Sequence, residues 1–575
     1  MTSAAVWAQR GRDLLSRAEF EEAQAAFARA IELEPNVGLH WALLGKCEAM
    51  RLGYHAAHDA LARACALAPD SAFMHVWLGH ALRERNDPEA ASAAYARASI
   101  LDRNDVTAAI GAALVMPVIY RDEQEIERWR ARHAEQLERL RHSRQRWDGW
   151  AQSVLRLEWS NFYLAYQGRN DRDLQTAYSD FVAGLLARAA AQWQQPLEPR
   201  RDDASGRIRV AFVSAHLCRH TVTDYFARWI TDLPRERFAV SAFHSGTRVD
   251  ECTQVFRASV DRFAQVPSDA HQLAAALREQ APDVIVYPDV GMSPHDVLLT
   301  NLRLAPTQIA AWGHPVTTGS AYIDAYLSCA AMEPADARSH YSEPLVLLPG
   351  IGVDYAPVRA SAAADRAAFR LSREAHLYVC PQSLFKIHPA TDALFLDILE
   401  QDEAAQLLFF AAPAKAQTDA FVARLTSGMR VRGVPMRNQV KLLPHVSREH
   451  FAALLGCCDV MLDPLHWSGG NTALDALAAG LPIVTLPGSE MRGRQSAAML
   501  RLIGMDDLVA SDARDYVAKA LRVASDRAHR AALSARIDEG LPKLFHRHDA
   551  IAALADAIER VRRRDAAASS PHLAP

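Results

Sequence analysis

Two patterns of hydrophobic and polar positions divide the chain. Up to about residue 195, apolar side chains recur at the three- and four-residue spacing that predicts amphipathic helices. After about residue 206, short apolar runs alternate with helix-like stretches. The sequence therefore predicts a helical first part followed by parallel sheets that helices cover on both faces.

The helical part contains an internal repeat. Small and aromatic residues recur every 34 positions in four registers: Gly11, Gly45 and Gly79; Ala23, Ala57 and Ala91; Phe27, Leu61 and Tyr95; Ala30, Ala64 and Ala98. This pattern resembles the tetratricopeptide repeat (TPR), a pair of antiparallel helices that cross at small residues. We expect about three regular units over residues 1–121, ending at the sequence LVMPVIY, and a helical connector over residues 122–200.

The pattern in the second part predicts two sets of about five strands. The first set is expected at residues 207–215, 238–245, 283–290, 308–313 and 325–329, and the second at residues 377–382, 406–413, 440–446, 459–465 and 482–488. A small, polar stretch at residues 359–374 separates them. We expect two doubly wound domains, over residues 201–358 and 359–560, with ligands at the carboxyl ends of their strands. The tail, residues 561–575, is expected to be disordered.

Composition narrows the class of protein. Lys plus Arg number 64 against 68 Asp plus Glu, a formal charge of −4, which predicts no nucleic-acid or anionic-membrane partner. The eight cysteines show no metal-ligand spacing, as expected of reduced thiols in a cytoplasmic protein. A secretion signal and a run of 18 apolar residues are both absent from the sequence, so neither export nor membrane spanning is predicted.

A glycine-rich turn between a predicted strand and helix is the first candidate site. It contains Gly469, Gly470, Asn471 and Thr472, with Asp475 beyond them. On one interpretation Asn471 or Thr472 only caps the helix and Asp475 occupies its first turn. On the other, the glycines let the backbone approach a phosphate at the helix start.

Four segments in order resemble the O-linked N-acetylglucosamine transferase and SPINDLY family. They are RVAFVSAHLCRHTVTDYF, LAPTQIAAWGHPVTTGSAYIDAYLS, LYVCPQSLFKIHP and GGNTALDALAAGLPIVTLPGSEMRGRQSAAMLRLIG. The resemblance covers essentially the whole chain. It implies a TPR α-solenoid followed by a GT-B fold of two Rossmann-like halves, acting as an inverting glycosyltransferase of the GT41 type.

The resemblance gives the glycine-rich turn a role. Gly469, Gly470, Asn471 and Thr472 would bind the diphosphate of a nucleotide sugar, and Asp475 would accept hydrogen bonds from the ribose. Animal members carry His-Thr-Thr where this chain has Gly470, Asn471 and Thr472, so the identity of the base stays open.

Lysine and histidine side chains supply the candidate chemistry. Lys386 follows a predicted strand, where its charge could neutralise the departing diphosphate, as the family's essential lysine does. His388 could reach phosphate or pack beside Pro389. His220 follows the first strand of its half and could accept a hydroxyl proton, or instead orient the acceptor and the diphosphate.

Further residues are implied by the same resemblance. Gly313, His314 and Pro315, with Thr317 to Gly319, would line the sugar pocket, and His450 would lie near the nucleotide base. Arg494 could contact phosphate or pair with Glu490.

The functional prediction is transfer of a sugar, most simply N-acetylglucosamine from UDP, onto Ser or Thr of a protein bound along the repeats. No Asp-x-Asp follows a strand so as to hold a metal against a diphosphate, so no metal or other cofactor is expected. Alternatives are a UDP-glucose-dependent asparagine glucosyltransferase, a GDP-fucose-dependent enzyme and a flagellin-modifying enzyme. From a different class, a non-catalytic TPR adaptor also fits the repeats.

Overall fold

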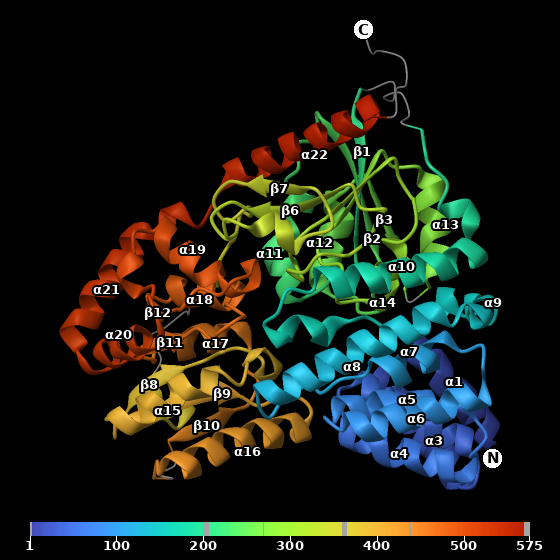
Figure 1. The fold of residues 1–575 in the computed structure, drawn as a ribbon, viewed down its shortest axis with the longest axis horizontal. Coiled ribbons are helices and arrows are strands. Elements are labelled where there is room, and N and C mark those ends of the chain that lie inside the picture. Colours follow the sequence, from blue (N-terminus) through green and yellow to red (C-terminus); the bar gives the residue numbers. More distant parts are fainter. Residues whose placement is uncertain (1–2, 199–205, 268, 359–364, 436–438, 569–575) are drawn as a thin grey trace.

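The computed structural model describes residues 3–198, 206–267, 269–358, 365–435 and 439–568. It has three parts, shown in Figure 1: a helical region up to residue 195, a first sheet domain (residues 206–358) and a second sheet domain (residues 365–547). The predicted boundary near residue 200 and the first residues of the polar stretch at 359–374 lie outside the described residues.

Three helix pairs open the chain, as the repeat predicted. Their bounds are α1 Ala4–Ser16 and α2 Phe20–Leu33, α3 Gly38–Met50 and α4 Tyr54–Leu67, α5 Ala72–Glu84 and α6 Pro88–Leu101. In each pair the repeating glycine faces the large residue of the partner helix. A Cβ atom added to Gly11 would lie 2.5 Å from Phe27, and one added to Gly79 would lie 2.7 Å from Tyr95. The residues that repeat every 34 positions therefore lie where the paired helices pack against each other.

The regular array ends after one more helix. Helix α7 (Val106–Leu114) packs on α6, and the chain then leaves the helical conformation within the predicted terminating sequence. The guanidinium group of Arg132 donates to the carbonyl oxygens of Ala112, Ala113 and Val115 and so satisfies the end of α7. Helices α8 (Glu123–His142), α9 (Trp147–Ala151) and α10 (Arg172–Ala189) follow, and α10 lies against the first sheet domain in Figure 1.

The first sheet domain holds seven parallel strands in the order β3-β2-β1-β4-β5-β6-β7. They are β1 Ile208–Ser214, β2 Phe238–His244, β3 Arg262–Gln265, β4 Val284–Tyr287, β5 Thr307–Ala310, β6 Ala325–Cys329 and β7 Leu345–Leu348, with helices α11 Thr221–Thr231, α12 Glu251–Ser259, α13 Ala270–Gln280 and α14 Pro294–Leu299. The edge strands β3 and β7 were not predicted. Strand β3, with the sequence RFAQ, lacks the continuous apolar run that marks the central strands, whereas β7, with the sequence LVLL, is a short apolar run that was not recognised as a strand.

The second sheet domain has the five predicted strands in the order β10-β9-β8-β11-β12. They are β8 His376–Val379, β9 Ala405–Phe410, β10 Val440–Leu443, β11 Val460–Leu462 and β12 Ile483–Val484, with helices α15 Thr391–Gln401, α16 Lys415–Arg432, α17 Arg448–Leu455, α18 Asn471–Ala478, α19 Gln495–Leu502, α20 Ala513–Ser525 and α21 Arg527–Gly540. Each sheet has one point where the strand order reverses, between β1 and β4 in the first and between β8 and β11 in the second. Ligands of doubly wound sheets bind at these points.

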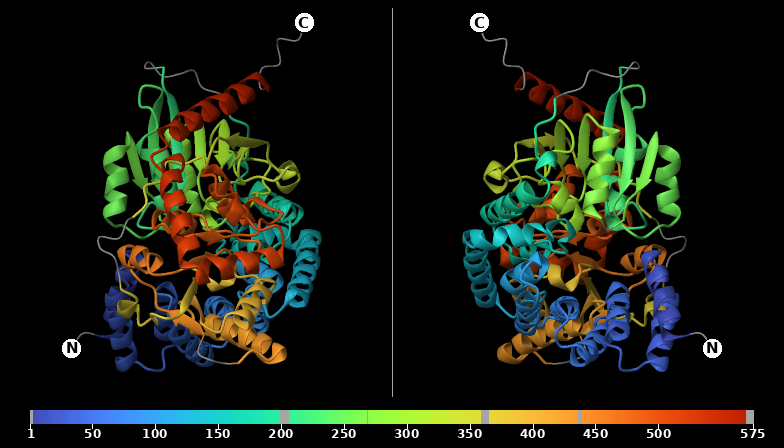
Figure 2. Two further views of the ribbon diagram at one scale, coloured as in Figure 1. Left: turned by 90° about the vertical axis from the view of Figure 1, so that its left-hand side faces the viewer. Right: turned by 90° about the vertical axis from the view of Figure 1, so that its right-hand side faces the viewer.

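The last helix, α22 (His548–Ala568), returns to the first sheet domain, as Figure 2 shows from two sides. Arg237 pairs with Asp556 at 2.8 Å and with Glu559 at 2.8 Å. The prediction of disorder from residue 561 is wrong for residues 561–568, because the helix continues to Ala568; residues 569–575 lie outside the described part. No helix in the described part of the chain is long and apolar enough to cross a membrane.

Candidate active site

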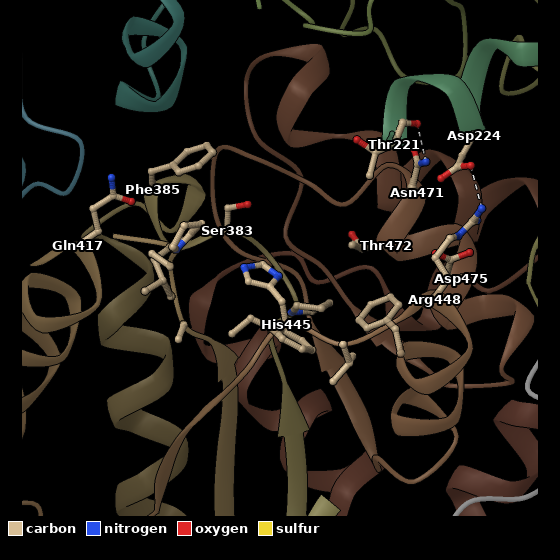
Figure 3. Close-up of a pocket in the computed structure, with 18 residues that line it drawn as sticks. Thr221, Asp224, Ser383, Phe385, Gln417, His445, Arg448, Asn471, Thr472 and Asp475 are labelled. Carbon is tan, nitrogen blue, oxygen red and sulfur yellow. Dashed lines mark hydrogen bonds and ion pairs between the residues drawn. The ribbon is translucent and has the colours of Figure 1, made fainter. Parts of the chain in front are cut away.

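A cavity of about 370 Å³ lies between the two sheet domains, and Figure 3 shows its lining. The second sheet domain supplies most of that lining, from the segments after β8, β9 and β10 and from the start of α18. Thr221 and Asp224 of α11 close it from the first sheet domain. The cavity therefore lies where the switch point of the second sheet faces the other domain.

A smaller cavity of about 120 Å³ shares Thr221, Asn471 and Thr472 with the larger one. Gly313, Pro315, Lys386 and Gly470 are among the other residues that line it. The two cavities thus meet at the starts of α11 and α18. A ligand with a large and a small end would fit across both.

The starts of two helices meet at that junction. The Asn471 side-chain amide donates to the carbonyl oxygen of Thr221 at 2.8 Å, and the Gln382 amide donates to the Thr472 hydroxyl at 2.7 Å. Neither Asn471 nor Thr472 caps α18, whose N-cap is Gly470, so the capping interpretation of the turn is wrong. Because α11 and α18 both direct their positive ends here, the junction attracts an anion.

Asp463 holds the glycine-rich turn in place, a residue that the sequence did not single out. Its carboxylate accepts hydrogen bonds from the Ser468 hydroxyl at 2.6 Å, the Gly469 N–H at 2.8 Å and the Thr485 hydroxyl at 2.7 Å. Burial raises the pKa of Asp463 to about 6. The Gly469 N–H is thus bonded within the turn, and phosphate binding by Gly469 stays a prediction. Gly470 borders the smaller cavity instead.

Lys386 is a partly buried cation on the wall of the smaller cavity. It ends a 3-10 turn after β8, and its Nζ atom lies 5.6 Å from the centre of the Trp467 ring. Burial lowers the pKa of Lys386 to about 8. Among the described residues no carboxylate forms an ion pair with it, so its positive charge remains available to a ligand.

Asp475 lines the larger cavity and belongs to a polar network that spans the two domains. It accepts a hydrogen bond from the Tyr355 hydroxyl at 2.9 Å, and Arg448, which pairs with Asp224 at 2.8 Å, lies 3.4 Å from the same hydroxyl. Burial raises the pKa of Asp475 to about 6. Asp475 lies one turn deeper in α18 than predicted, with no acidic residue in the first turn.

His220 is the N-cap of α11, directly before Thr221. Its Nδ1 atom accepts a hydrogen bond from the Val222 N–H at 3.2 Å, and burial lowers the pKa of His220 to about 3. A neutral histidine whose Nδ1 accepts a hydrogen bond carries its proton on Nε2. In this state His220 can donate a hydrogen bond to a ligand, but its Nε2 has no lone pair to accept a proton.

Only some residues of the loop after β5 line the smaller cavity. Gly313 and Pro315 line the smaller cavity, whereas His314 turns away and stacks on Phe162, with ring centres 5.1 Å apart. Thr317 and Thr318 bond to Glu343 and line neither cavity. The structure therefore places only part of the predicted sugar-binding loop at the site.

His450, predicted near the nucleotide base, is exposed at the start of α17 and contacts Ser447. It lines neither cavity; the residues of the loop after β10 that border the larger cavity are His445 and Val446, which are themselves exposed, with Phe410 and Phe451 beside them. His388 is buried against His466 away from both cavities. Arg494 donates to the Gly488 carbonyl oxygen, and Glu490 pairs with Arg492 rather than with Arg494.

The helical region also reaches the site. The 3-10 turn Phe162–Gln167 places Tyr166 against Trp467, with ring centres 4.3 Å apart, and against Phe385 at 4.8 Å. Trp467 and Phe385 flank Lys386. A segment of the helical region thus supports the residues that hold the lysine.

Comparison with known proteins agrees with this architecture. Residues 356–545 match Glycosyl transferase family 41. The whole chain resembles the solved structure of a mutant Thermobaculum terrenum O-GlcNAc transferase, with a TM-score of 0.76 and 23% identity over 99% of this chain and 100% of that one. That likeness establishes the fold: a helical repeat region followed by two Rossmann-like domains.

Two curated relatives match this chain over less than half of their own length. The probable UDP-N-acetylglucosamine--peptide N-acetylglucosaminyltransferase SPINDLY of Solanum lycopersicum is 25% identical over 342 residues, 58% of this chain and 36% of that protein. The UDP-glucose:protein N-beta-glucosyltransferase of Actinobacillus pleuropneumoniae serotype 7 is 26% identical over 273 residues, 46% of this chain and 42% of that protein. The chain spans less than half the length of these relatives.

Proposed function

Given the family 41 glycosyltransferase domain at residues 356–545, we propose that this protein transfers a sugar from a nucleotide donor to a protein side chain. The observation that carries the proposal is Lys386, a partly buried cation that lines the smaller cavity together with the first residues of two helices. A buried charge that lacks a partner destabilises the folded protein. A bound diphosphate would pair with the charge and remove this destabilisation. A non-catalytic adaptor, which binds no diphosphate, would be destabilised by the lysine without gaining a function from it.

The nucleoside of the donor fits the larger cavity. Asp475 would accept hydrogen bonds from ribose hydroxyls, and the aromatic group of Phe410, His445 and Phe451 would contact the base. The diphosphate would lie at Lys386 and the start of α18, and the sugar would lie in the smaller cavity beside Gly313 and Pro315.

Transfer would be a direct displacement at the anomeric carbon, with inversion. The acceptor attacks the carbon opposite the diphosphate, and negative charge grows on the departing oxygen. Lys386 and the two helix N-termini would stabilise this charge most strongly in the transition state. In this proposal these groups supply the positive charge, and a metal is not required.

The donor proposed first is UDP-N-acetylglucosamine and the acceptor Ser or Thr, because one relative carries that donor in its name. The other relative's name makes UDP-glucose the leading alternative donor, with an asparagine acceptor. GDP-fucose and a flagellin acceptor remain further candidates.

The acceptor protein is proposed to bind along the helix pairs. Leu39 of α3 and Phe73 of α5 occupy the same repeat position 34 residues apart, and both are exposed, at 45% and 41%. Such equivalent apolar side chains suit an extended polypeptide. The eight cysteines are all free thiols, which suits a reducing compartment such as the cytoplasm.

Thermal unfolding with UDP, GDP, UDP-N-acetylglucosamine, UDP-glucose and GDP-fucose tests the proposal. A ligand at 100 times its dissociation constant should stabilise the protein by about 2.7 kcal/mol. The stabilising nucleotide identifies the base, and release of nucleoside diphosphate identifies the donor. If no nucleotide or nucleotide sugar stabilises the protein, the proposal is wrong.

A further inference from the structure

The switch point of the first sheet carries a second histidine next to His220. His216 follows β1, and Asp289 follows the neighbouring strand β4. The His216 Nδ1 atom and the Asp289 Oδ2 atom form a short hydrogen bond. The His216 and His220 rings stack with centres 4.2 Å apart and an angle of 24° between their planes. His216 and Asp289 were not among the predicted site residues.

Asp289 lies buried within a polar cluster. It is 1% exposed, and its Oδ2 atom also accepts a hydrogen bond from the Ser214 hydroxyl at 3.1 Å. Asp296 lies nearby and accepts from the Ala215 N–H and the Ser245 hydroxyl. Burial and then the charge of Asp289 raise the pKa of Asp296 to about 7. Asp296 is therefore a carboxyl group that holds a proton for part of the time near neutral pH, while the hydrogen bond of His216 goes to Asp289.

The two histidines have opposite proton positions. His220 accepts a hydrogen bond at Nδ1 and carries its proton on Nε2, as described above. His216 instead donates from Nδ1 to Asp289, so the lone pair of neutral His216 lies on Nε2. The side chain of His216 is 21% exposed, whereas that of Asp289 is 1% exposed. Of these two rings, only His216 offers a nitrogen that can accept a proton.

We infer that His216, oriented by Asp289, accepts the acceptor's proton during sugar transfer, while His220 donates a hydrogen bond from Nε2. The inference rests on the proposed glycosyl transfer and assigns the proton in that reaction. The acceptor oxygen or amide nitrogen forms a bond to the anomeric carbon, and the bond from that carbon to the diphosphate oxygen breaks. Its electron pair leaves with the nucleoside diphosphate, and the acceptor's proton passes to Nε2 of His216. Asp289 stabilises the resulting imidazolium ion, as a carboxylate does beside a histidine base.

The electrostatic surroundings agree with this role. Burial alone would lower the pKa of His216, but the hydrogen bond and charge of Asp289 outweigh it, and the net shift is upward. The other titratable groups that face His216 are Asp296, which adds to the upward shift, and His220 and His244, whose pKa values are both lowered chiefly by burial. His216 is therefore the histidine of this cluster that gains a proton most readily.

The first test compares pH profiles of kcat/KM for His216→Gln, Asp289→Asn, His220→Asn and the control His450→Gln, whose residue lies outside both cavities. In the wild type the rate should rise with pH as His216 loses its proton, with a midpoint above 6.5. His216→Gln should lower turnover at least a hundredfold and abolish that rise. Asp289→Asn should lower turnover and move the midpoint to lower pH. His220→Asn should lower turnover without moving the midpoint.

A second measurement does not depend on activity. Imidazole ¹⁵N NMR of the full chain, with His216 assigned by the signals lost in His216→Gln, reports which nitrogen carries each proton. We expect a proton on Nδ1 of His216 and on Nε2 of His220. Nucleotide affinity should be unchanged in both His216→Gln and Asp289→Asn, and their melting temperatures show whether each variant folds.

The outcomes separate the two proposals. Wild-type turnover of a nucleotide sugar with an unchanged rate and pH profile in His216→Gln overturns the inference and leaves the proposed function standing. A proton on Nε2 of neutral His216 also overturns it. If the wild type binds no nucleotide sugar, the proposed function is wrong. The proton transfer assigned to His216 and Asp289 is then wrong as well.

Discussion

The side-chain amide of Gln417 donates a hydrogen bond to the carbonyl oxygen of Glu84, 2.8 Å away. Gln417 lines the larger cavity, and Glu84 is the last residue of α5 in the third helix pair. The repeat array and the proposed nucleotide pocket are therefore directly bonded. The Glu84 carboxylate also accepts a hydrogen bond from Tyr163 at 2.8 Å, which joins the segment after α9 to the same point.

Replacing Gln417 with Met should affect both stability and nucleotide affinity. The substitution keeps the length of the side chain but leaves the buried Glu84 carbonyl oxygen without its partner, at a cost of about 1–3 kcal/mol. Thermal unfolding and nucleotide titration measure the two effects. Gln401→Met, an exposed position on α15, is the matched control. Unchanged melting and affinity in Gln417→Met would show that the contact is incidental.

Lys386→Met should lower turnover far more than donor affinity. Its charge is needed most when the diphosphate departs, so a loss of about 2.7 kcal/mol in the transition state gives a hundredfold slower reaction. Lys386→Arg should rescue only partly, because a planar fork does not replace a compact ammonium group. Donor hydrolysis without acceptor provides the assay, and Lys519→Met on α20 is the control. Equal rates for wild type and Lys386→Met would remove the lysine from the mechanism.

Asp475→Asn should stabilise the ligand-free protein near neutral pH while weakening nucleotide binding. The pKa of Asp475 is raised to about 6 by burial. A raised folded-state pKa contributes stability that is complete below the unfolded value, near 3.9, and lost as pH rises through about 6. The variant should therefore melt higher than wild type at pH 7.5, with the difference vanishing near pH 4.

The same variant should lose about 1.5–3 kcal/mol of nucleotide affinity at pH 7.5, the usual range for hydrogen bonds to a charged group. Isothermal titration measures this loss. Unchanged affinity in the folded variant would exclude Asp475 from the ribose site.

Removal of divalent metals should leave sugar transfer intact. Lys386 and the starts of α11 and α18 are proposed to supply the positive charge that the departing diphosphate needs. Turnover after dialysis against EDTA, compared with turnover after re-addition of magnesium or manganese, is the measurement. Activity that disappears with EDTA and returns with metal would refute the proposed mechanism.

His445→Ala should weaken nucleotide binding, whereas His450→Ala should not. His445 lines the larger cavity beside Phe410, whereas His450 on α17 lines neither cavity. Loss of an aromatic contact to the base should cost about 0.5–1.5 kcal/mol. Titration of both variants with the stabilising nucleotide distinguishes them, and the reverse order of effects would place the base elsewhere.

The repeat units, the central strands and the loop that carries Lys386 could be predicted because each is encoded locally. A 34-residue spacing, an apolar run or a polar residue after a strand is visible in a short window. The edge strand β3 was missed because its sequence RFAQ contains no such run, whereas β7 is an apolar run of four residues, LVLL, that was not recognised as a strand. His450 lines neither cavity, whereas His445 and Val446 of the preceding loop line the larger one, a difference that no local pattern in the sequence reveals.

The remaining site residues depend on contacts between distant segments. Asp463 was not singled out because its partners include Thr485, 22 residues away in sequence. His216 and Asp289 are 73 residues apart and meet only because β1 and β4 are neighbours in the sheet. Strand order, which a single sequence does not reveal, was needed to find them.

The turn Phe162–Gln167 has a mechanical consequence. Phe162 stacks on His314 of the first sheet domain, and Tyr166 packs on Trp467 of the second, so this turn bridges both walls of the cleft. A large hinge rotation would have to slide both aromatic faces at once. Substrate entry and product exit should therefore depend on small displacements of loops, and the helical region should move little relative to the cleft during turnover.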